Sequence, residues 1–196
     1  MSFLTGTNTE LIYASTTAGT AKSTFTTEVQ INDTAGMGIQ ASIPPFFFAS
    51  NASTNGKSLR IVARGILSST GTPTYTFTLR MGAAASITAA IILGSAAITT
   101  GSGVTNTIWE FEGDFTMRTP VGAAGANSTG VGTGLITGAG LASPFIYPLY
   151  GGAATPGTVA TVDTSIQNYL NFNVACSASS ASNTITLQHL LVLGLN

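Results

Sequence analysis

The residues that could carry out catalysis are few and scattered. His189 is the only histidine and Cys176 the only cysteine in the chain of 196 residues. A Ser-His-Asp triad would need His189, yet the sequence lacks the Gly-x-Ser-x-Gly motif that exposes a nucleophilic serine at a sharp turn. One histidine and one cysteine are also too few for a zinc site with the usual ligands. We therefore interpret Cys176 as a small buried hydrophobic residue. His189 is expected to be structural, on an apolar strand face that it shares with Ile185, Leu187, Leu191 and Leu193.

Two groups of acidic residues have a spacing that catalysis sometimes uses. Asp33-Thr-Ala-Gly36 is close to the Asp-Thr/Ser-Gly signature of aspartic proteases, but Ala35 interrupts it and Asp163-Thr-Ser supplies no second copy. We interpret Asp33 as part of an Asx-type turn after the preceding strand. Glu110 and Glu112 would lie on one face of a strand, whereas a glycosidase needs two carboxyl groups set across a cleft. Cross-strand ion pairs explain these two acids better.

The sequence argues against several classes of ligand. The glycine-rich segments 130–134 and 151–157 lack the Lys-Ser/Thr ending of a phosphate-binding loop. Six Lys and Arg residues without a basic run give no electrostatic footprint for nucleic acid. The most apolar window, 83–98, is too short and too interrupted for a membrane-spanning helix, and the first ten residues lack the basic and apolar regions of a secretory signal. We predict a protein that is not an enzyme, with no catalytic, cofactor-binding or metal-binding residues.

The charge content is unusually low. Only 7% of the residues are charged, against about 25% in typical globular domains. Hydrophobic residues make up 44%, which is enough for a core, and the formal net charge is −1. A surface of Thr, Ser, Gly and Asn is hydrated but repels neighbouring molecules weakly, because net charge is what keeps proteins apart. This composition favours a chain that works inside an assembly; an extracellular bacterial domain is the alternative.

Alternation of apolar and polar residues predicts β-strands in the middle third of the chain. The segments 57–67 and 74–81 both alternate, and a turn with a glycine and a proline, 68–73, lies between them. We expect these two segments to pair as an antiparallel hairpin. A third strand is expected at 107–118, with Trp109 and Phe111 on its apolar face.

More than half of the charged residues fall in these three segments. We predict that three arginines and three acids share one sheet face and form ion pairs across neighbouring strands. They are Arg60, Arg64, Arg80, Glu110, Glu112 and Asp114.

The flanking segments carry weaker patterns. Strands are expected at 169–176 and 184–194, and less clearly at 11–14 and 25–31. The stretch 84–93 fits either a short helix or a strand.

Three further segments are rich in proline or glycine. The segments 43–48 and 143–150 combine proline with aromatic residues, so we expect strand entries or arms. Their aromatic rings are expected to fill the core; contact patches on the surface are the alternative. Residues 120–140 lack aromatic residues, which predicts a long loop with at most a weak edge strand.

Together these patterns predict an all-β protein. We expect an antiparallel β-sandwich of about eight main strands, jelly-roll-like, with long Gly/Ala/Ser/Thr-rich loops or arms. We place the whole chain, 1–196, in one domain, with an N-terminal arm within 1–20 and a loop-rich region at 119–160.

The middle third also resembles a known group of proteins. The segment Gly56-Lys-Ser-Leu-Arg, the following Ala-Arg-Gly, the Gly-Thr-Pro turn and the later Trp-Glu strand are similar to virion proteins of tailed bacteriophages with jelly-roll-like sandwiches. The resemblance covers the middle third of the chain, and the flanks match in composition only. It implies a structural part of the virion, such as a capsid decoration or cement protein, and no catalytic residues.

This resemblance implies a set of partners and a location. We expect a homo-oligomer, with a trimer favoured, that binds other virion proteins such as the major capsid protein on the capsid surface, and neither nucleic acid nor membrane. The alternative is a tail-associated or fibre protein that binds a host surface glycan or receptor through Tyr147, Tyr150 and Trp109, although Trp109 fits a core position better. A hydrolase on the same scaffold is a third hypothesis, which would involve His189.

Overall fold

The computed structural model describes residues 9–49, 57–119, 127–142, 146–151 and 160–195. These residues form thirteen strands and one short helix, α1 (Thr34–Met37). In chain order the strands are β1 (Thr9–Ala14), β2 (Val29–Gln30), β3 (Ser42–Ile43), β4 (Ser58–Ser69), β5 (Thr74–Gly82), β6 (Ala90–Ser95), β7 (Ile98–Thr99), β8 (Val104–Thr119), β9 (Ser128–Gly138), β10 (Ile146–Tyr150), β11 (Ala160–Val162), β12 (Asn168–Cys176) and β13 (Thr184–Leu195).

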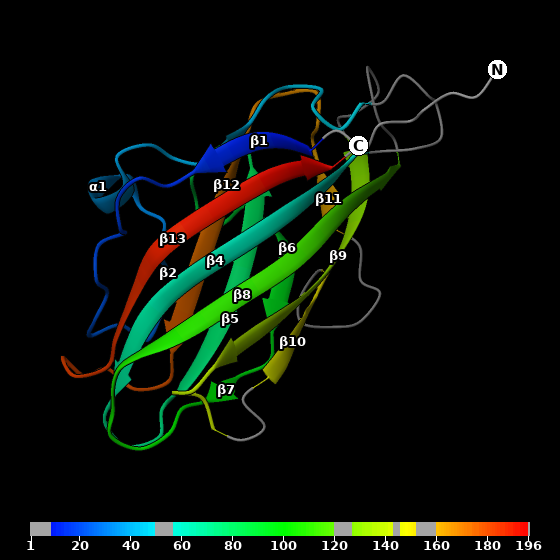
Figure 1. The fold of residues 1–196 in the computed structure, drawn as a ribbon. Coiled ribbons are helices and arrows are strands. Elements are labelled where there is room, and N and C mark those ends of the chain that lie inside the picture. The colour runs from blue at the N-terminus through cyan, green and yellow to red at the C-terminus, as the bar shows by residue number, and fades with distance from the viewer. Residues whose placement is uncertain (1–8, 50–56, 120–126, 143–145, 152–159, 196) are drawn as a thin grey trace.

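The strands form two packed layers (Figure 1). The front layer has the order β1-β13-β4-β8-β9, and the back layer has the order β6-β5-β12-β2. Strand β10 connects the layers, because it pairs with β9 along its length and with β6 at its last two residues. Every pair of neighbouring strands in these layers is antiparallel. The predicted antiparallel, jelly-roll-like β-sandwich is therefore confirmed.

Aromatic rings fill the space between the layers. The ring of Trp109 from β8 stacks on Phe172 from β12 with 5.8 Å between centroids, and Phe77 from β5 lies 5.5 Å from Trp109. Phe111 meets Phe172 edge-on at 5.2 Å. All four side chains are fully buried. These residues occupy inward positions of strands in which apolar and polar residues alternate. The two-residue period of the sequence therefore places each ring in the core.

The predicted hairpin between the first two central strands is wrong. Strand β4 pairs with β13 and β8 in the front layer, whereas β5 pairs with β6, β7 and β12 in the back layer. Residues 70–73 carry the chain from one layer to the other, and the Tyr75 hydroxyl donates to the Ser68 carbonyl across this crossing (3.5 Å). Alternation shows which side of a strand faces the core, but a hairpin and a crossing between layers have the same alternation.

The loop predicted at 120–140 is also wrong in its second half. Residues 128–138 form β9, which pairs with β8, β10 and β11 and so lies inside the sheet. Its inward positions are mostly glycines, and their missing side chains make room for large neighbours. A Cβ on Gly130 would lie 2.3 Å from the ring of Phe115, and one on Gly134 would lie 2.8 Å from the ring of Phe111. Strand β9 therefore has few apolar side chains because its glycines leave space for the aromatic rings of β8.

The other strands expected in the flanks are largely present. The strands at 169–176, 184–194 and 11–14 are confirmed, and β1 occupies part of the region expected to be an N-terminal arm. The candidate at 25–31 is reduced to β2, and the stretch 84–93 ends in β6 and contains no helix. The loop-rich region at 119–160 contains β9 and β10.

The two proline-aromatic segments differ from each other. Phe47 and Phe48 are buried in the core, as predicted, but Phe46 is 47% exposed. Strand β10 pairs on both sides rather than forming an arm, and Pro148 occupies the part of it that pairs with β9 alone. A proline lacks a backbone donor, so this one-sided position suits it.

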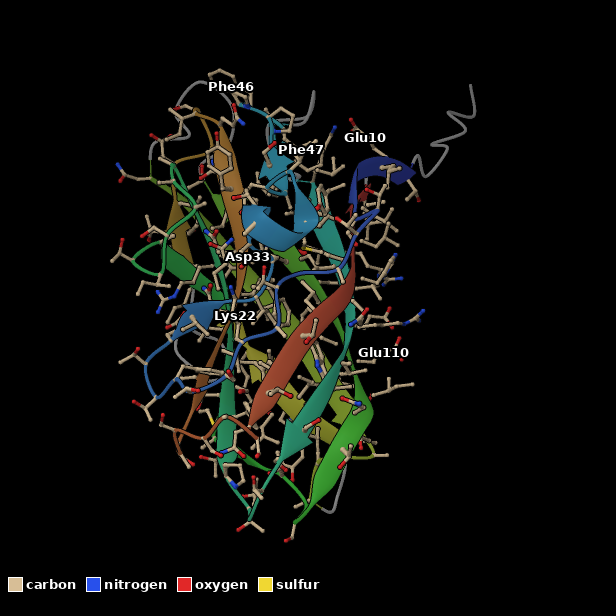
Figure 2. The ribbon with its side chains drawn as sticks, turned by 90° about the vertical axis from the view of Figure 1, so that its left-hand side faces the viewer. Glu10, Lys22, Asp33, Phe46, Phe47 and Glu110 are labelled. Carbon is tan, nitrogen blue, oxygen red and sulfur yellow. The ribbon has the colours of Figure 1, made fainter. Side chains whose placement is uncertain are left out.

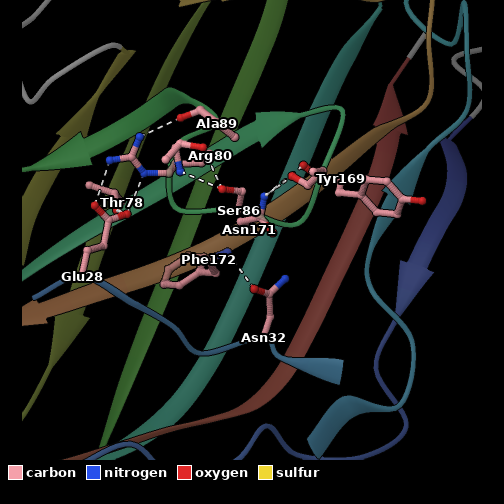
Figure 3. A network of polar contacts seen from close by, with 11 residues as sticks. Glu28, Asn32, Thr78, Arg80, Ser86, Ala89, Tyr169, Asn171 and Phe172 are labelled. Carbon is pink, nitrogen blue, oxygen red and sulfur yellow. Dashed lines mark hydrogen bonds and ion pairs between the residues drawn. The ribbon is translucent and has the colours of Figure 1, made fainter. Parts of the chain in front are cut away.

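A polar network covers the outer side of the back layer (Figure 3). The Arg80 guanidinium binds Glu28 through Nε at 2.7 Å and Nη2 at 2.8 Å, and also donates to the Ala89 carbonyl. The Thr78 hydroxyl donates to Glu28 at 2.5 Å. Nearby, the Asn32 carboxamide oxygen accepts from the backbone N–H of Phe172. The chain before β4 is thus held against the back layer by polar contacts.

Arg80 therefore does not join the three acids of β8, contrary to the prediction. It lies in the other layer and pairs with Glu28, in a segment whose strand pattern is too weak to place it. Burial alone would raise the pKa of Glu28, but the bonds from Arg80 and Thr78 outweigh burial and hold that pKa below its usual value.

We predict that Gly132→Ala will destabilise the fold. A Cβ there would lie 2.9 Å from the backbone oxygen of Ile92 and 2.8 Å from the Leu93 side chain, so the two layers would have to separate. The free energy of unfolding, measured by urea denaturation, should fall by about 1–3 kcal/mol. Thr133→Ala, on the exposed side of the same strand, is the matched control and should change it little. Equal stability of the Gly132 and Thr133 variants would contradict this packing.

We predict that Arg80→Met will lower stability near neutral pH by about 2 kcal/mol, because it leaves the mostly buried Glu28 carboxylate without its main partner. The folded-state pKa of Glu28 is depressed. The contribution of ionised Glu28 to the free energy of unfolding is therefore fully present above its unfolded-state pKa of about 4.3. This contribution is lost as the pH falls from there through the lower folded-state pKa. Urea denaturation at several pH values should show a shallower acid dependence in the variant, and an unchanged dependence would refute the role of this pair.

Candidate functional site

The outward side of the front layer brings together residues from five strands. The strand registers place them in three rows that run across β13, β4, β8, β9 and β10. We call this surface the outward face. Its rows are His189-Arg64-Glu110-Thr137-Ile146, Leu191-Val62-Glu112-Leu135-Pro148 and Leu193-Arg60-Asp114-Thr133-Tyr150.

Two ion pairs cross from β4 to β8 on the outward face. Arg60 binds Asp114 with both ends of its fork, through Nε to Oδ1 at 3.0 Å and Nη2 to Oδ2 at 3.2 Å. Arg64 places Nε and Nη2 on one oxygen of Glu110, at 2.8 and 2.7 Å. The bonds to Asp114 raise the pKa of Arg60. The ion pairs predicted between these four residues are confirmed.

Glu112 is bound more loosely than its neighbours. Its Oε1 lies 3.8 Å from Arg60 Nε, beyond hydrogen-bonding distance, and its side chain is 60% exposed. Glu110 has only one of its two oxygens in the bonds from Arg64. The outward face therefore carries more carboxylate oxygens than Arg60 and Arg64 bind.

Large apolar side chains surround these charges. Ile108 is 66% exposed, Ile146 54% and Leu135 50%, and all three lie on the outward side of their strands. Leu11 on β1, next to Leu193, is 62% exposed. Exposed apolar side chains scattered singly are ordinary, but a group on one sheet face is typical of an interaction surface.

The outward face is hollowed between β8 and β10. The groove has a volume of about 610 Å³, and its lining includes Glu112, Asp114, Leu135, Pro148 and Tyr150. Carboxylates and apolar walls thus meet in one shallow groove. Figure 2, turned from the view of Figure 1, shows Glu110 at this side of the molecule, away from the Lys22 and Asp33 pair.

The three aromatic residues considered for glycan binding end in different places. Trp109 is fully buried between the layers and is a core residue. Tyr147 packs against the core and its hydroxyl donates to the Ala142 carbonyl at 2.7 Å. Tyr150 alone lines the groove.

His189 shares a strand face with Leu191 and Leu193, as predicted, but not with Ile185 and Leu187. A bulge in β13 between Leu187 and His189 inserts an extra residue and reverses the alternation. Ile185 and Leu187 point into the core, whereas His189 is on the outward face opposite Arg64. Its Nδ1 is buried and makes no hydrogen bond with the described residues.

The other candidate chemical groups form local turns. Asp33 is the N-cap of α1 and accepts from the backbone N–H groups of Gly36 and Thr20. Burial would raise the pKa of Asp33, but its bond with Lys22 and these backbone bonds hold it below the usual value. Asp163 accepts from the N–H of Ser165 in a turn of its own. Asp33 is structural, as interpreted, but it caps a helix rather than forming an Asx turn, and Cys176 is buried as predicted.

Within the described ranges, no three His, Cys, Asp or Glu residues gather in a way that could hold a metal ion. No helix in the same ranges is long and apolar enough to cross a membrane.

Sequence reasoning missed the β9 and β10 side of the groove. The signal was present in β9, where glycine occupies 130, 132, 134 and 138 and larger residues occupy 131, 133, 135 and 137. The two-residue period is still visible in β9, even though most of its inward residues are glycines.

Comparison with known proteins gives little further guidance. No protein-family model and no curated protein sequence matches the chain. Among solved structures, lectin I-B4 from Griffonia simplicifolia in its metal-free form has 8% identity and a TM-score of 0.37, with 98% of this chain and 96% of the lectin covered. The CBM2 module of the evolved Dit of Lactobacillus casei BL23 phage J-1 has 10% identity and a TM-score of 0.32, with 97% of both chains covered. With TM-scores below 0.5, neither likeness contributes to the conclusions below.

We predict that Arg64→Ala will cost little stability in the isolated chain. The side chains of Arg64 and Glu110 are 57% and 41% exposed, so water replaces much of what the pair provides. Thermal and urea unfolding should show a loss of at most about 1 kcal/mol. If the outward face is covered in an assembly, the same change should weaken assembly far more. Small and equal effects on the stability of the chain and on the strength of assembly would show that the pair is solvated in the assembly as well.

Proposed function

We propose that this chain is a non-enzymatic structural protein of a bacteriophage virion. In this proposal it decorates the capsid surface as a homo-oligomer, binds the major capsid protein and stabilises the head. The outward face is its assembly surface. The motifs of the middle third that resemble virion proteins, Lys57 to Arg64 and Trp109-Glu110, contribute β4 and β8, the two strands that carry the ion pairs of this face.

One observation carries the proposal. Exposed Ile108, Leu135 and Ile146 gather on the same sheet face as the two hydrogen-bonded ion pairs, in a chain with only 7% charged residues. Apolar side chains around a few well-placed charges are what a protein interface requires: the apolar area supplies the free energy and the charges fix the register. A protein that stayed free in solution would gain nothing from exposing them.

A second candidate is a tail-associated or fibre protein that binds a host surface glycan or receptor. The groove favours it, because Tyr150 could stack on a sugar ring while the neighbouring carboxylates accept bonds from its hydroxyl groups. The position of the chain in the virion separates the two candidates. Immunogold labelling of the head supports decoration, and labelling of the tail supports the fibre.

We predict that Leu135→Asp will abolish binding to capsid shells without unfolding the protein. Leu135 is half exposed, so in the free chain the change costs only the roughly 0.2–1 kcal/mol of a like-charge pair with the opposite Glu112. In a contact it removes apolar area and introduces a charge that a docked partner would have to desolvate. Ile87→Asp is the matched control, since Ile87 is 46% exposed in the segment between β5 and β6, in the other layer.

The assay is co-sedimentation of each variant with shells that lack the protein, together with thermal melts. The proposal expects wild-type chain and Ile87→Asp to sediment with the shells and to raise their melting temperature, and Leu135→Asp to stay in solution. Failure of the wild-type chain to bind the shells would refute the decoration role.

A further inference from the structure

The charges of β8 that remain unpaired have opposite signs and lie on the same side of the strand. Among the residues that the structure describes, Glu112 has an ionic contact with Arg60 alone, at 3.8 Å. Arg118, near the end of β8, is exposed and forms no ion pair with any described residue. Met117 is buried in the core, so Arg118 after it points to the outward side with Glu112; Arg118 is the unpaired residue of a bulge between Met117 and Thr119. Glu112 and Arg118 are six residues apart, about 20 Å along the strand, and cannot meet within one chain.

The outward residues between them continue the pattern. Glu112 and Asp114 present carboxylates, which accept hydrogen bonds, and Thr116 and Arg118 present a hydroxyl and a guanidinium, which donate them. Thr116 can donate outward, because its 2.8 Å bond with the Ser58 hydroxyl can have Ser58 as donor. Along the strand, the order is acceptor, acceptor, donor, donor.

This order is complementary to itself when reversed. We propose that the partner on the outward face is a second copy of this chain, with β8 of one molecule crossing β8 of the other in antiparallel fashion about a two-fold axis near residue 115. Glu112 of each copy then meets Arg118 of the other, and Asp114 meets Thr116. An isologous contact requires this kind of self-complementary patch.

The rest of the face is compatible with a second copy. The neighbouring strand β9 carries Leu135, Val131 and other uncharged residues on this side, which can pack in the contact. A net charge of −1 gives little repulsion between copies. The inference rests on the proposed use of the outward face as an assembly surface, and it gives a dimer in place of the trimer expected from the sequence.

Charge reversal tests the pairing directly. In Glu112→Arg the contact would set the introduced guanidinium against Arg118, and in Arg118→Glu it would set two carboxylates together. Each variant alone should therefore self-associate at least about tenfold more weakly than wild type. In a mixed dimer of the two variants, both contacts again join opposite charges. One contact is the wild-type Glu112–Arg118 pair, and in the other the arginine stands at 112 and the glutamate at 118. The mixture should therefore dimerise to within about threefold of wild type.

Sedimentation velocity of the full chain, in the absence of shells, measures the association, and thermal melts confirm that each variant is folded. A monomeric wild-type chain, a wild-type trimer, or variants whose mixture stays as weak as each alone would each overturn the inference.

The decoration role is tested separately by shell binding. If the chain is monomeric but Leu135→Asp still abolishes shell binding, the outward face contacts another virion protein; the dimer is then refuted and the proposed function stands. If dimerisation follows the charge pattern but shells are not bound, the inference stands and the decoration role fails.

Discussion

The fit between β8 and β9 is the constraint on which the rest of the front layer depends. Strand β8 contributes Phe111 and Phe115 to the core, and these rings need more room than a strand with ordinary side chains would leave them. The glycines of β9 leave that room, so rings from β8 lie over the inward side of β9. The close packing fixes the register of β8 against β9, and that register decides which residues meet on the outward face. The same register of β8 against β9 therefore decides which side chains pack in the core and which lie together on the outward face.

The few charges of the chain are used in two distinct ways. On the back layer, Arg80 and Glu28 are mostly buried and hold the N-terminal part of the chain in place, so they stabilise the monomer. On the outward face, Arg60 and Arg64 form well-ordered pairs that water reaches, so they contribute little to the stability of the isolated chain. Under the proposed assembly role, a partner would cover these pairs and the exposed apolar side chains around them.

The sequence predicted the elements better than their neighbours. The alternation of β4, β5, β8, β12 and β13 is clear because each strand has large apolar residues on one side. Which strands pair was not predictable, because the turn at 70–73 suits a hairpin or a crossing between layers equally well.

Strand β9 resembles a loop in sequence because most of its inward residues are glycines, and their role is visible only beside the rings of β8. The prediction for His189 was wrong about Ile185 and Leu187 because a bulge reverses the alternation before His189, and nothing in the local residue pattern marks this bulge. The candidate site was predicted in part: the pairs of Arg60 and Arg64 with the acids of β8 followed from charge and alternation. The groove required β10, which long-range pairing brings beside β9 and which composition alone does not encode.

The most direct test of the assembly role of the outward face is a cryo-electron microscopy map of capsid shells with the chain bound. We expect protein density, from a second copy or from a neighbouring virion protein, to cover the outward side of β4, β8 and β9, with Leu135 and Glu112 inside the contact. A map in which that side faces solvent, while the chain is attached through the outer side of β5 and β12, would contradict this role.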